Sequence, residues 1–252
     1  MNGGQYPENP SFKEAKKNGR TYFERVKSEE PEEKAIGKCN DKSVDGICAG
    51  YEEYCKSAEY DPVNLPIDIA LKLSPAKENV LEFTKNLVRY ADLVSPMTAQ
   101  YLSALMSVSL DREFVLDFTG INEKGLLVSG MGYNLENKIL TINGDVGDFA
   151  GVGMADCTLI VNGSAGNSAG SCLRSKIIIY GNAGENLGHL AQDSKIFVSG
   201  EIKSIGVMDR KTEIYQKQKS AYAEKDAYVK LELPDRMAEG LCPGLPKLPT
   251  LP

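Results

Sequence analysis

The feature that most constrains the fold of this chain is a Gly-x-x-Gly-x-x-x-Gly spacing that occurs three times between residues 144 and 188. Each copy follows a short aliphatic run, and its first glycine, the anchor glycine, is Gly144, Gly163 or Gly181. A fourth aliphatic run ends at Gly200, so successive anchors are nineteen, eighteen and nineteen residues apart. A fixed period with one short strand per period is typical of a solenoid whose units stack strand on strand.

The run before each anchor alternates between apolar and other residues, as a half-buried strand does. Aliphatic residues stand two and four positions before every anchor: Ile142 and Leu140, Val161 and Leu159, Ile179 and Ile177, and Val198 and Ile196. Because successive strand residues point to opposite faces, these residues predict one interior face. Apolar residues two and ten positions after the anchors are expected to complete it: Val146, Ala165, Ala183, Ile202, Met154, Leu173 and Ala191.

A period of about eighteen residues also builds the left-handed β-helix of hexapeptide-repeat acyltransferases. That fold needs an aliphatic residue at every sixth position. Steps of six from Ile142 instead reach Asp148, Met154, Ile160, Gly166 and Cys172. The sequence therefore predicts a mainly β protein built on a right-handed, single-stranded β-helix.

The position three before each anchor should point away from the interior, yet it is apolar in three of the four runs. These positions, here called the outward column, hold Thr141, Ile160, Ile178 and Phe197. Stacked about 4.8 Å apart on neighbouring strands, the three apolar members would form a stripe that something must cover. The chain's own helices are the favoured cover and a partner subunit is the alternative, so Ile160, Ile178 and Phe197 are candidate interaction residues.

The glycine repeats resemble a known repeat domain. GDVGDFAGVGM over residues 144–154, with the matching GSAGNSAGSCL and GNAGENLGHLA, resembles the GXGXG domain of the glutamate synthase large subunit and the β-helical subunit of formylmethanofuran dehydrogenase. The resemblance covers about residues 112–206. It implies a structural domain that packs against subunits holding flavin, iron–sulfur or metal centres, and it transfers no catalytic residue to this chain.

The segments before the repeats differ in composition. Residues 1–60 are highly charged and poor in aliphatic residues, which predicts a partly disordered arm. Residues 61–110 have helical apolar spacing, and a serine–proline pair marks the expected start of each of two helices. The pairs are Ser74-Pro75 and Ser95-Pro96. These helices are expected to cap the open end of a β-helix at residues 111–206.

The remaining element predictions concern the two ends of the repeat region. Alternating apolar residues predict strands over 114–118 and 126–129, which would lead into the β-helix. Residues 207–252 are expected to contain a polar helix over 211–230, followed by a proline-rich tail.

Composition excludes several classes of function. A net charge of −6 argues against a dedicated surface for nucleic acid or acidic lipid. No apolar stretch approaches the ~20 residues of a membrane span, and the first ten residues lack a signal-peptide core. The six cysteines form no dense disulfide pattern, so the expected location is the cytoplasm.

Residues that could carry chemistry are few. The candidate metal ligands are Cys39, Cys48 and Cys55, with Cys242 as a distant fourth. Zinc ligands usually come in pairs two to four residues apart, and this spacing lacks such pairs, so we expect reduced thiols and no bound metal or cofactor. His189, the only histidine, is interpreted as structural, and no catalytic residue is expected.

Two sets of polar residues recur after the anchors. Asp148, Asn167 and Glu185 stand four positions after them, and Asp145, Asn182 and Glu201 stand one position after them. Stacked acids could hold a cation or act as an acid and base, but solvated turn residues are the favoured interpretation.

These observations predict a non-catalytic scaffold subunit or domain of a larger oxidoreductase assembly, with protein subunits as partners. Two alternatives stay open. One is a free-standing protein of glutamate-synthase type with an activity of its own. The other is a metal-binding module built on the N-terminal cysteines.

Overall fold

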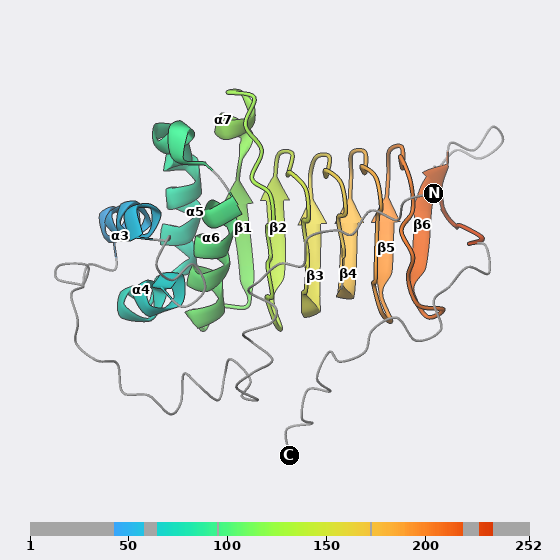
Figure 1. The fold of residues 1–252 in the computed structure, drawn as a ribbon, viewed down its shortest axis with the longest axis horizontal. Coiled ribbons are helices and arrows are strands. Elements are labelled where there is room, and N and C mark those ends of the chain that lie inside the picture. The colour runs from blue at the N-terminus through green and yellow to red at the C-terminus, as the bar shows by residue number, and fades with distance from the viewer. Residues whose placement is uncertain (1–42, 58–64, 95, 172, 219–226, 234–252) are drawn as a thin grey trace, which may run out of the picture. The chain divides into compact units, whose positions relative to one another are not determined.

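A seven-stranded sheet whose strands follow sequence order dominates the computed structural model (Figure 1). The structure describes residues 43–57, 65–94, 96–171, 173–218 and 227–233. The strands are β1 (Glu113–Asp117), β2 (Ile139–Asn143), β3 (Ala155–Val161), β4 (Arg174–Ile179), β5 (Lys195–Val198), β6 (Glu213–Gln218) and β7 (Ala227–Lys230). Strands β1 to β6 are parallel, and only β7 is antiparallel to its neighbour. The chain therefore winds into a β-solenoid, as the glycine spacing predicts.

The register of the sheet confirms the predicted interior. Leu159 pairs with Leu140 on one side and with Ile177 on the other, and Ile177 pairs with Ile196. All eight strand residues predicted to point inward are fully buried. The residues predicted after the anchors are buried too, apart from Ile202, which is half-buried in the last coil. Like residues thus stack on like residues along the whole solenoid.

The glycines of each repeat serve two purposes. The anchor glycines let neighbouring coils approach closely, since a Cβ on Gly181 would lie 2.7 Å from the carbonyl carbon of Gly163. The glycines seven positions after the anchors instead take positive φ angles, of 76° at Gly151, 69° at Gly170 and 68° at Gly188. An L-residue is strained there, so the repeat needs glycine at both kinds of position.

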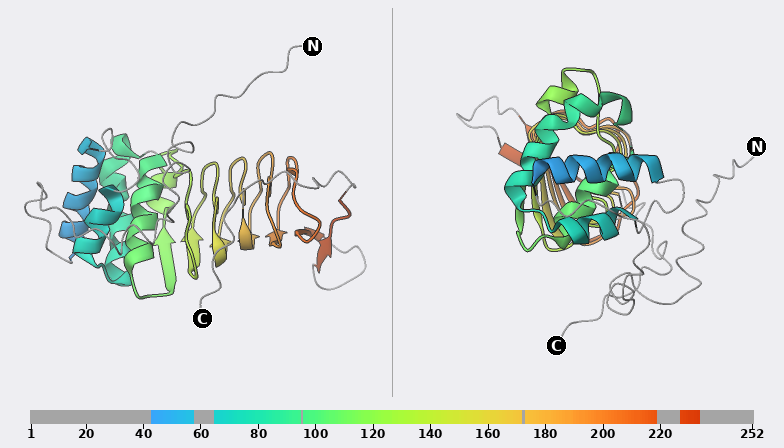
Figure 2. Two further views of the ribbon diagram at one scale, coloured as in Figure 1. Left: turned by 60° about the horizontal axis from the view of Figure 1, so that its bottom comes forward. Right: turned by 90° about the vertical axis from the view of Figure 1, so that its left-hand side faces the viewer.

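Helices cover the β1 end of the solenoid, as the predicted cap requires. They are α3 (Val44–Ser57), α4 (Leu65–Leu73), α5 (Lys77–Asn86), the 3₁₀ helix η1 (Leu87–Leu93), α6 (Pro96–Val108) and the short α7 (Thr119–Asn122). Helix α5 packs on β1, where Asp117 N–H donates to Thr84 Oγ1 (3.1 Å). Seen from that end, the helices lie across the opening of the coil (Figure 2). Among the described residues, no helix has both the length and the apolar composition that a membrane crossing requires.

Aromatic rings form the core of the helical cap. The Tyr51 ring lies 5.5 Å from the rings of both Phe83 and Tyr101, measured between centroids. Each buried hydroxyl has a partner: Tyr51 Oη lies 2.7 Å from Thr98 Oγ1, and Tyr101 Oη donates to the Ile47 carbonyl (2.9 Å). Because α3 supplies Tyr51 and Ile47, the cap extends into the segment that the sequence assigned to the charged arm.

One of the two predicted helix starts is wrong. Ser74 ends α4 instead of starting α5: its N–H donates to the Ala70 carbonyl, its Oγ donates to the Leu71 carbonyl, and its φ is 41°. Helix α5 begins later, at Lys77. The second start is confirmed, because α6 begins at Pro96. A serine before a proline can therefore mark the end of one helix rather than the start of the next.

Two other predicted elements differ in the structure. Residues 126–129 form no strand, although the Val128 carbonyl accepts a bond from Gly147 N–H as part of the first coil. The polar helix predicted within 211–230 is wrong, since its described residues form β6 and β7. Ile214 is fully buried and extends the interior column by one coil, which favours a strand over a helix. The charged arm before residue 43 and the proline-rich tail after residue 233 lie outside the described residues.

Candidate functional site

The outward column is one continuous line of side chains on the sheet. The register places Thr141, Ile160, Ile178 and Phe197 in succession, with Val115 before them and Tyr215 after them. Val115 is 45% exposed, and the other members are half-buried. The structure thus brings the three predicted interaction residues together in the predicted order.

Aromatic side chains cover the last member of the column. The Phe197 ring stacks on Tyr215 with 4.7 Å between centroids, and Tyr228 meets it edge-on at 5.6 Å. Lys176 Nζ lies 5.2 Å from the centre of the same ring. Phe197 is therefore held by β4, β6 and β7, and its cover comes from the C-terminal strands.

The helices do not supply the cover that the sequence favoured. They pack on β1 and on one another at the end of the sheet (Figure 1). The physical reason is that the first coil would otherwise expose both an unpaired strand edge and the open interior of the solenoid. Helices that cover this end remove more apolar surface from water than helices on the outward face would. Within the described part of the chain, Ile160 and Ile178 remain half-buried.

The residues beside the column mix charge with aromatic surface. Lys176 and Lys195 pair with each other in the sheet two positions to one side, and Lys195 Nζ lies 3.7 Å from Glu213 Oε2. On the other side, Asn162 Nδ2 donates to Asn143 Oδ1 (2.8 Å). Tyr180, which directly follows β4, is 56% exposed. The face is thus apolar along its centre and polar along its margins.

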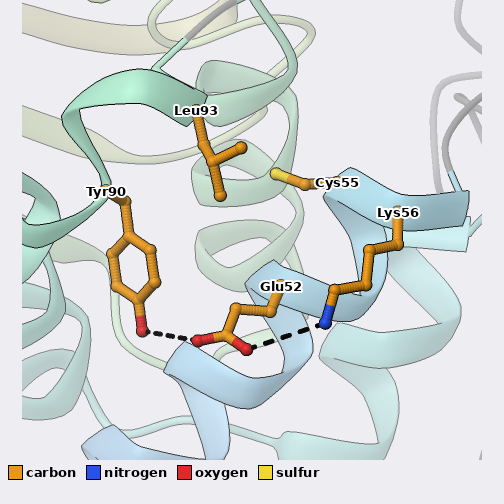
Figure 3. Close-up of a pocket in the computed structure, with 5 residues that line it drawn as sticks. All are labelled: Glu52, Cys55, Lys56, Tyr90 and Leu93. Carbon is orange, nitrogen blue, oxygen red and sulfur yellow. Dashed lines mark hydrogen bonds and ion pairs between the residues drawn. The ribbon is translucent and has the colours of Figure 1, made fainter.

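A shallow pocket lies between α3 and η1, with a volume of about 270 Å³ (Figure 3). It is lined by Glu52, Cys55, Lys56, Tyr90 and Leu93. Tyr90 Oη donates to Glu52 Oε1 (3.2 Å), and the other oxygen of Glu52 lies 3.9 Å from Lys56 Nζ. Burial raises the pKa of the Cys55 thiol, so this sulfur stays protonated and a poor nucleophile. Among the lining residues, the polar groups of Tyr90 and Lys56 thus both contact Glu52.

Only two of the four candidate metal ligands lie among the described residues. Cys48 and Cys55 lie on α3, two helical turns apart, while Cys39 and Cys242 fall outside the described residues. Burial raises the pKa of both described thiols, whereas metal binding requires thiolates. Among the described residues, no group of three or more histidine, cysteine, aspartate or glutamate side chains could hold a metal ion. The absence of a bound metal stays a prediction.

The recurring polar residues of the turns bind the backbone of the following coil. Asp148 Oδ1 accepts a bond from Asn167 N–H (2.7 Å), and Asn167 Oδ1 accepts one from Glu185 N–H (2.9 Å). The other set works in the same way through Asp145, Ser164, Asn182 and Glu201. These side chains therefore satisfy amides that the turns would leave unpaired. These residues lie in turns, as the favoured interpretation expects, and their side chains also link neighbouring coils.

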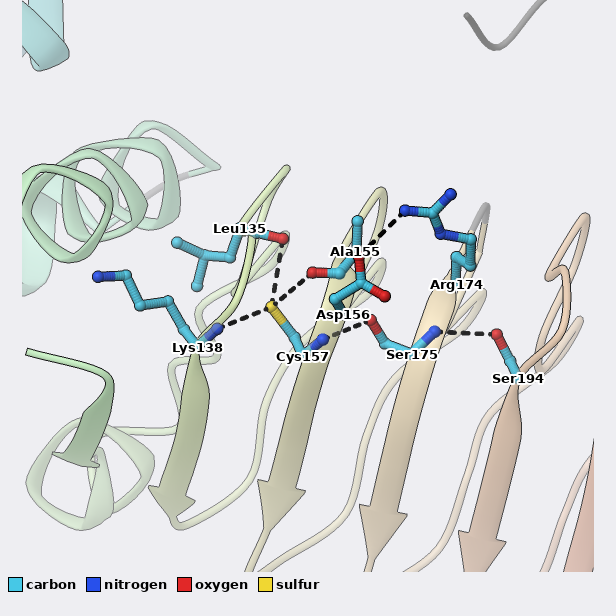
Figure 4. Close-up of polar contacts among 8 residues, drawn as sticks. All are labelled: Leu135, Lys138, Ala155, Asp156, Cys157, Arg174, Ser175 and Ser194. Carbon is cyan, nitrogen blue, oxygen red and sulfur yellow. Dashed lines mark hydrogen bonds and ion pairs between the residues drawn. The ribbon is translucent and has the colours of Figure 1, made fainter. Parts of the chain in front are cut away.

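A third set of such contacts lies at the N-terminal ends of strands β2 to β5, and the sequence patterns did not reveal it (Figure 4). Lys138 N–H donates to Cys157 Sγ (3.3 Å), Cys157 N–H to Ser175 Oγ (3.0 Å), and Ser175 N–H to Ser194 Oγ (3.1 Å). All four residues stand six positions before an anchor glycine, so their spacing was the available signal. Burial raises the pKa of the Cys157 thiol, which acts here as a structural acceptor.

The side chain of Lys138 joins the solenoid to the cap. It is buried, and its Nζ donates to the carbonyls of Ser109 and Asp111, both at 2.7 Å. Removal from water lowers the pKa of Lys138, although the nearby Asp111 acts in the opposite direction. At the equivalent position the other coils have cysteine or serine, so the lysine marks the coil that meets the helices.

His189 occupies an exposed turn, where its N–H donates to the Asn186 carbonyl (3.2 Å). A Cβ on Gly206 would lie 2.7 Å from the His189 Cα, so the next coil passes directly over this backbone. Both contacts involve the backbone, so the structural role expected for the histidine side chain stays a prediction.

Comparisons with known proteins leave the family open. No family model matches this chain, and neither a curated protein nor a solved structure matches it. The resemblance of the repeats to glutamate synthase and formylmethanofuran dehydrogenase therefore stays a prediction.

Proposed function

We propose that this chain is a non-catalytic scaffold subunit, or scaffold domain, of a larger assembly, and that a partner subunit packs on its outward column. One observation carries the proposal: Ile160 and Ile178 are stacked in register on the parallel sheet and remain half-buried. Apolar residues aligned on a regular surface with polar margins are typical of a protein interface.

The use of the polar side chains supports a scaffold over an enzyme. Asp145, Asp148 and Cys157 accept bonds from backbone amides of neighbouring residues in the fold. Lys138 is engaged with two carbonyls. Side chains occupied in this way stabilise the coils. A scaffold function uses the regular surface that such a framework maintains.

The nature of the assembly follows from the resemblance of the glycine repeats alone. On that basis the partner is an oxidoreductase subunit that carries the flavin, iron–sulfur or metal centre. This chain then contributes shape and contact area, and its partner contributes the chemistry.

The test is to isolate the tagged full-length chain from its source cells at natural abundance. A photo-crosslinking residue in place of Ile178 should join the chain to one partner subunit. Ile178→Lys should abolish that association while leaving the melting temperature within about 2 °C, because the new charge lies on the outer face. Glu201→Lys places a lysine at an exposed turn away from the column and should retain the partner.

Retention of the partner by Ile178→Lys would exclude the outward column as the binding surface. A chain that purifies alone and forms no crosslink would favour the free-standing protein. A partner that depends on Ile178 but carries no flavin, iron–sulfur or metal centre would remove the oxidoreductase assignment and keep the scaffold.

A further inference from the structure

The last residues of the sequence carry a second repeat, with a period of three. Four pairs of an apolar residue and a proline follow one another at this spacing: Cys242-Pro243, Leu245-Pro246, Leu248-Pro249 and Leu251-Pro252. Regular prolines three residues apart are typical of a polyproline II helix, which has three residues per turn. Leucines form one edge of such a helix, prolines form a second, and Gly244, Lys247 and Thr250 form the third. Residues 242–252, here called the Leu-Pro tail, thus have two apolar edges and one polar edge.

The spacing of this repeat matches the spacing of the outward column. Strands β1 to β6 lie side by side in sequence order (Figure 1), so every second member of the column is about 9.6 Å from the last. One turn of a polyproline II helix advances by about 9.3 Å. Three leucines one turn apart therefore span the column from Phe197 on β5 to Val115 on β1, with one leucine at every second strand.

The column and its margin offer a contact to each apolar edge. Ile160 and Ile178 are half-buried and Val115 is 45% exposed, so their outer surfaces are open to leucine side chains. Tyr180 stands two positions after Ile178, which places it on the same face, and it is 56% exposed. Proline-rich helices dock on surfaces that carry aromatic rings, so Tyr180 provides a contact for the proline edge.

The described chain ends beside the column, which brings the tail within reach. Leu231 N–H donates to the Ile214 carbonyl (2.9 Å), and Ile214 directly precedes Tyr215, the last member of the column. Leu245 follows Leu233, the last described residue, by twelve positions. Twelve extended residues reach roughly 40 Å, which exceeds the length of the whole column. A tether of this kind keeps the tail at a high effective concentration near the column.

The other long segments outside the described residues are poorer occupants. The charged arm before residue 43 contains one valine, one isoleucine and no leucine. Segments 58–64 and 219–226 each join two described elements, so neither can extend along the column. Of these segments, only the Leu-Pro tail combines apolar edges, a matching period and an attachment beside the column.

We propose that the Leu-Pro tail docks along the outward column of its own chain. Its leucines then contact every second member of the column, and the central leucine, Leu248, lies beside Ile160. Its polar edge, with Lys247, faces water. The consequence of this docking rests on the proposed function, because the tail and the partner subunit would occupy the same surface. The tail is then an internal competitor that the partner displaces.

The test uses the purified full-length chain with a photo-crosslinking residue in place of Thr141, the polar member of the column. Illumination should join this position to a peptide of the Leu-Pro tail within a monomer, as mass spectrometry of the digested monomer identifies. A crosslinking residue in place of Glu201, at an exposed turn away from the column, should not capture the tail.

Two triple variants alter the tail and keep all its prolines. The leucine-edge variant should lower the crosslink yield by about tenfold or more, because the apolar contact with the column is lost. The polar-edge variant is the matched control and should keep the yield. The leucine-edge changes are Leu245→Asn, Leu248→Asn and Leu251→Asn. The polar-edge changes are Gly244→Asn, Lys247→Asn and Thr250→Asn.

Three results would each overturn the docking: no crosslink to the tail, equal yields in the two triple variants, or a crosslink found only between two copies. The amount of co-purified partner tests the competition. The leucine-edge variant should retain about twofold more partner than wild type, or better, because the tail no longer occupies the site. Equal retention would contradict the competition.

The two proposals fail in different ways. A partner that is lost in Ile178→Lys, without any crosslink to the tail, would keep the proposed function and remove the docking. A crosslink within the monomer of a chain that captures no partner would remove the proposed function and the competition, and would keep the docking.

Discussion

Tyr51 in the helical cap and Ile179 in the solenoid are both fully buried, but their surroundings are built differently. Ile179 pairs with Val161 in one coil and Val198 in the next, which are the same position of the same repeat. Tyr51 instead contacts the rings of Phe83, Tyr90 and Tyr101, which come from three other helices. Its hydroxyl bonds to Thr98. A repeat supplies its own environment, whereas the cap assembles one from distant segments.

This difference changes what a substitution disturbs. In the solenoid, each coil is stabilised mainly by its two neighbours, so a fault in one coil weakens two interfaces. In the cap, several helices share one aromatic cluster, so a fault there acts on all of them at once. The contrast can be tested at a solenoid core position, at the junction and at a turn.

The largest effect is expected from a charge inside the solenoid. Ile179→Asp should destabilise the protein by more than about 4 kcal/mol, because the aliphatic interior offers the carboxylate no partner. Ile178→Asp makes the same change one residue earlier, on the outer face, and should cost less than about 1 kcal/mol. Urea unfolding followed by circular dichroism measures both. Similar losses in the two variants would show that the register is wrong.

A smaller effect is expected at the junction between the two regions. Lys138→Met keeps the length of the side chain but leaves the carbonyls of Ser109 and Asp111 without their donor. It should lower the free energy of unfolding by about 2 to 4 kcal/mol. Lys138→Arg retains a donor and should recover part of the loss. An unchanged stability in Lys138→Met would mean that the cap and the solenoid do not depend on this contact.

The same lysine predicts a pH dependence. Burial holds the pKa of Lys138 in the folded protein below its ordinary value of 10.5. Between those two values the unfolded chain binds more protons, so the stability due to Lys138 rises with pH. The difference in unfolding free energy between wild type and Lys138→Met should therefore grow as pH approaches 10.5. A difference that shrinks over this interval would contradict the assignment.

The smallest effect is expected at a turn. Ser164→Ala removes the acceptor for Asn182 N–H and should cost about 1 kcal/mol. Ser164→Asn restores an acceptor of the kind that the next coil already uses at this position, and should recover most of the loss. Thermal unfolding distinguishes the two variants. Equal melting temperatures for wild type and Ser164→Ala would show that water replaces the side chain at no cost.

The sequence predicted the solenoid well because its evidence was local and repeated. Each interior residue two or four positions before an anchor glycine is buried as expected, and the apolar residues after the anchors follow the same rule apart from Ile202. The prediction was wrong at β6, where the glycine spacing stops but the solenoid adds one more strand. Ile214 is buried there because the preceding coil offers a strand edge and an apolar column, neither of which its own segment encodes.

The candidate site was predictable in its residues but not in its surroundings. Ile160, Ile178 and Phe197 are aligned as the spacing predicts. Tyr215 and Tyr228 cover Phe197. This contact depends on how the chain turns after the last coil, and the repeat does not specify that turn. The helices were expected to cover this face, but they pack against the open β1 end of the solenoid instead.

By itself, the sequence of this protein determined the repeating coil, its interior and the line of outward apolar residues. These follow from periods of two and of about nineteen residues, and a period is a local property of a chain. Only the tertiary structure decided the partners of Lys138, Tyr51 and Phe197. Their contacts join segments far apart in sequence, and such contacts depend on how whole elements pack, which no single segment records.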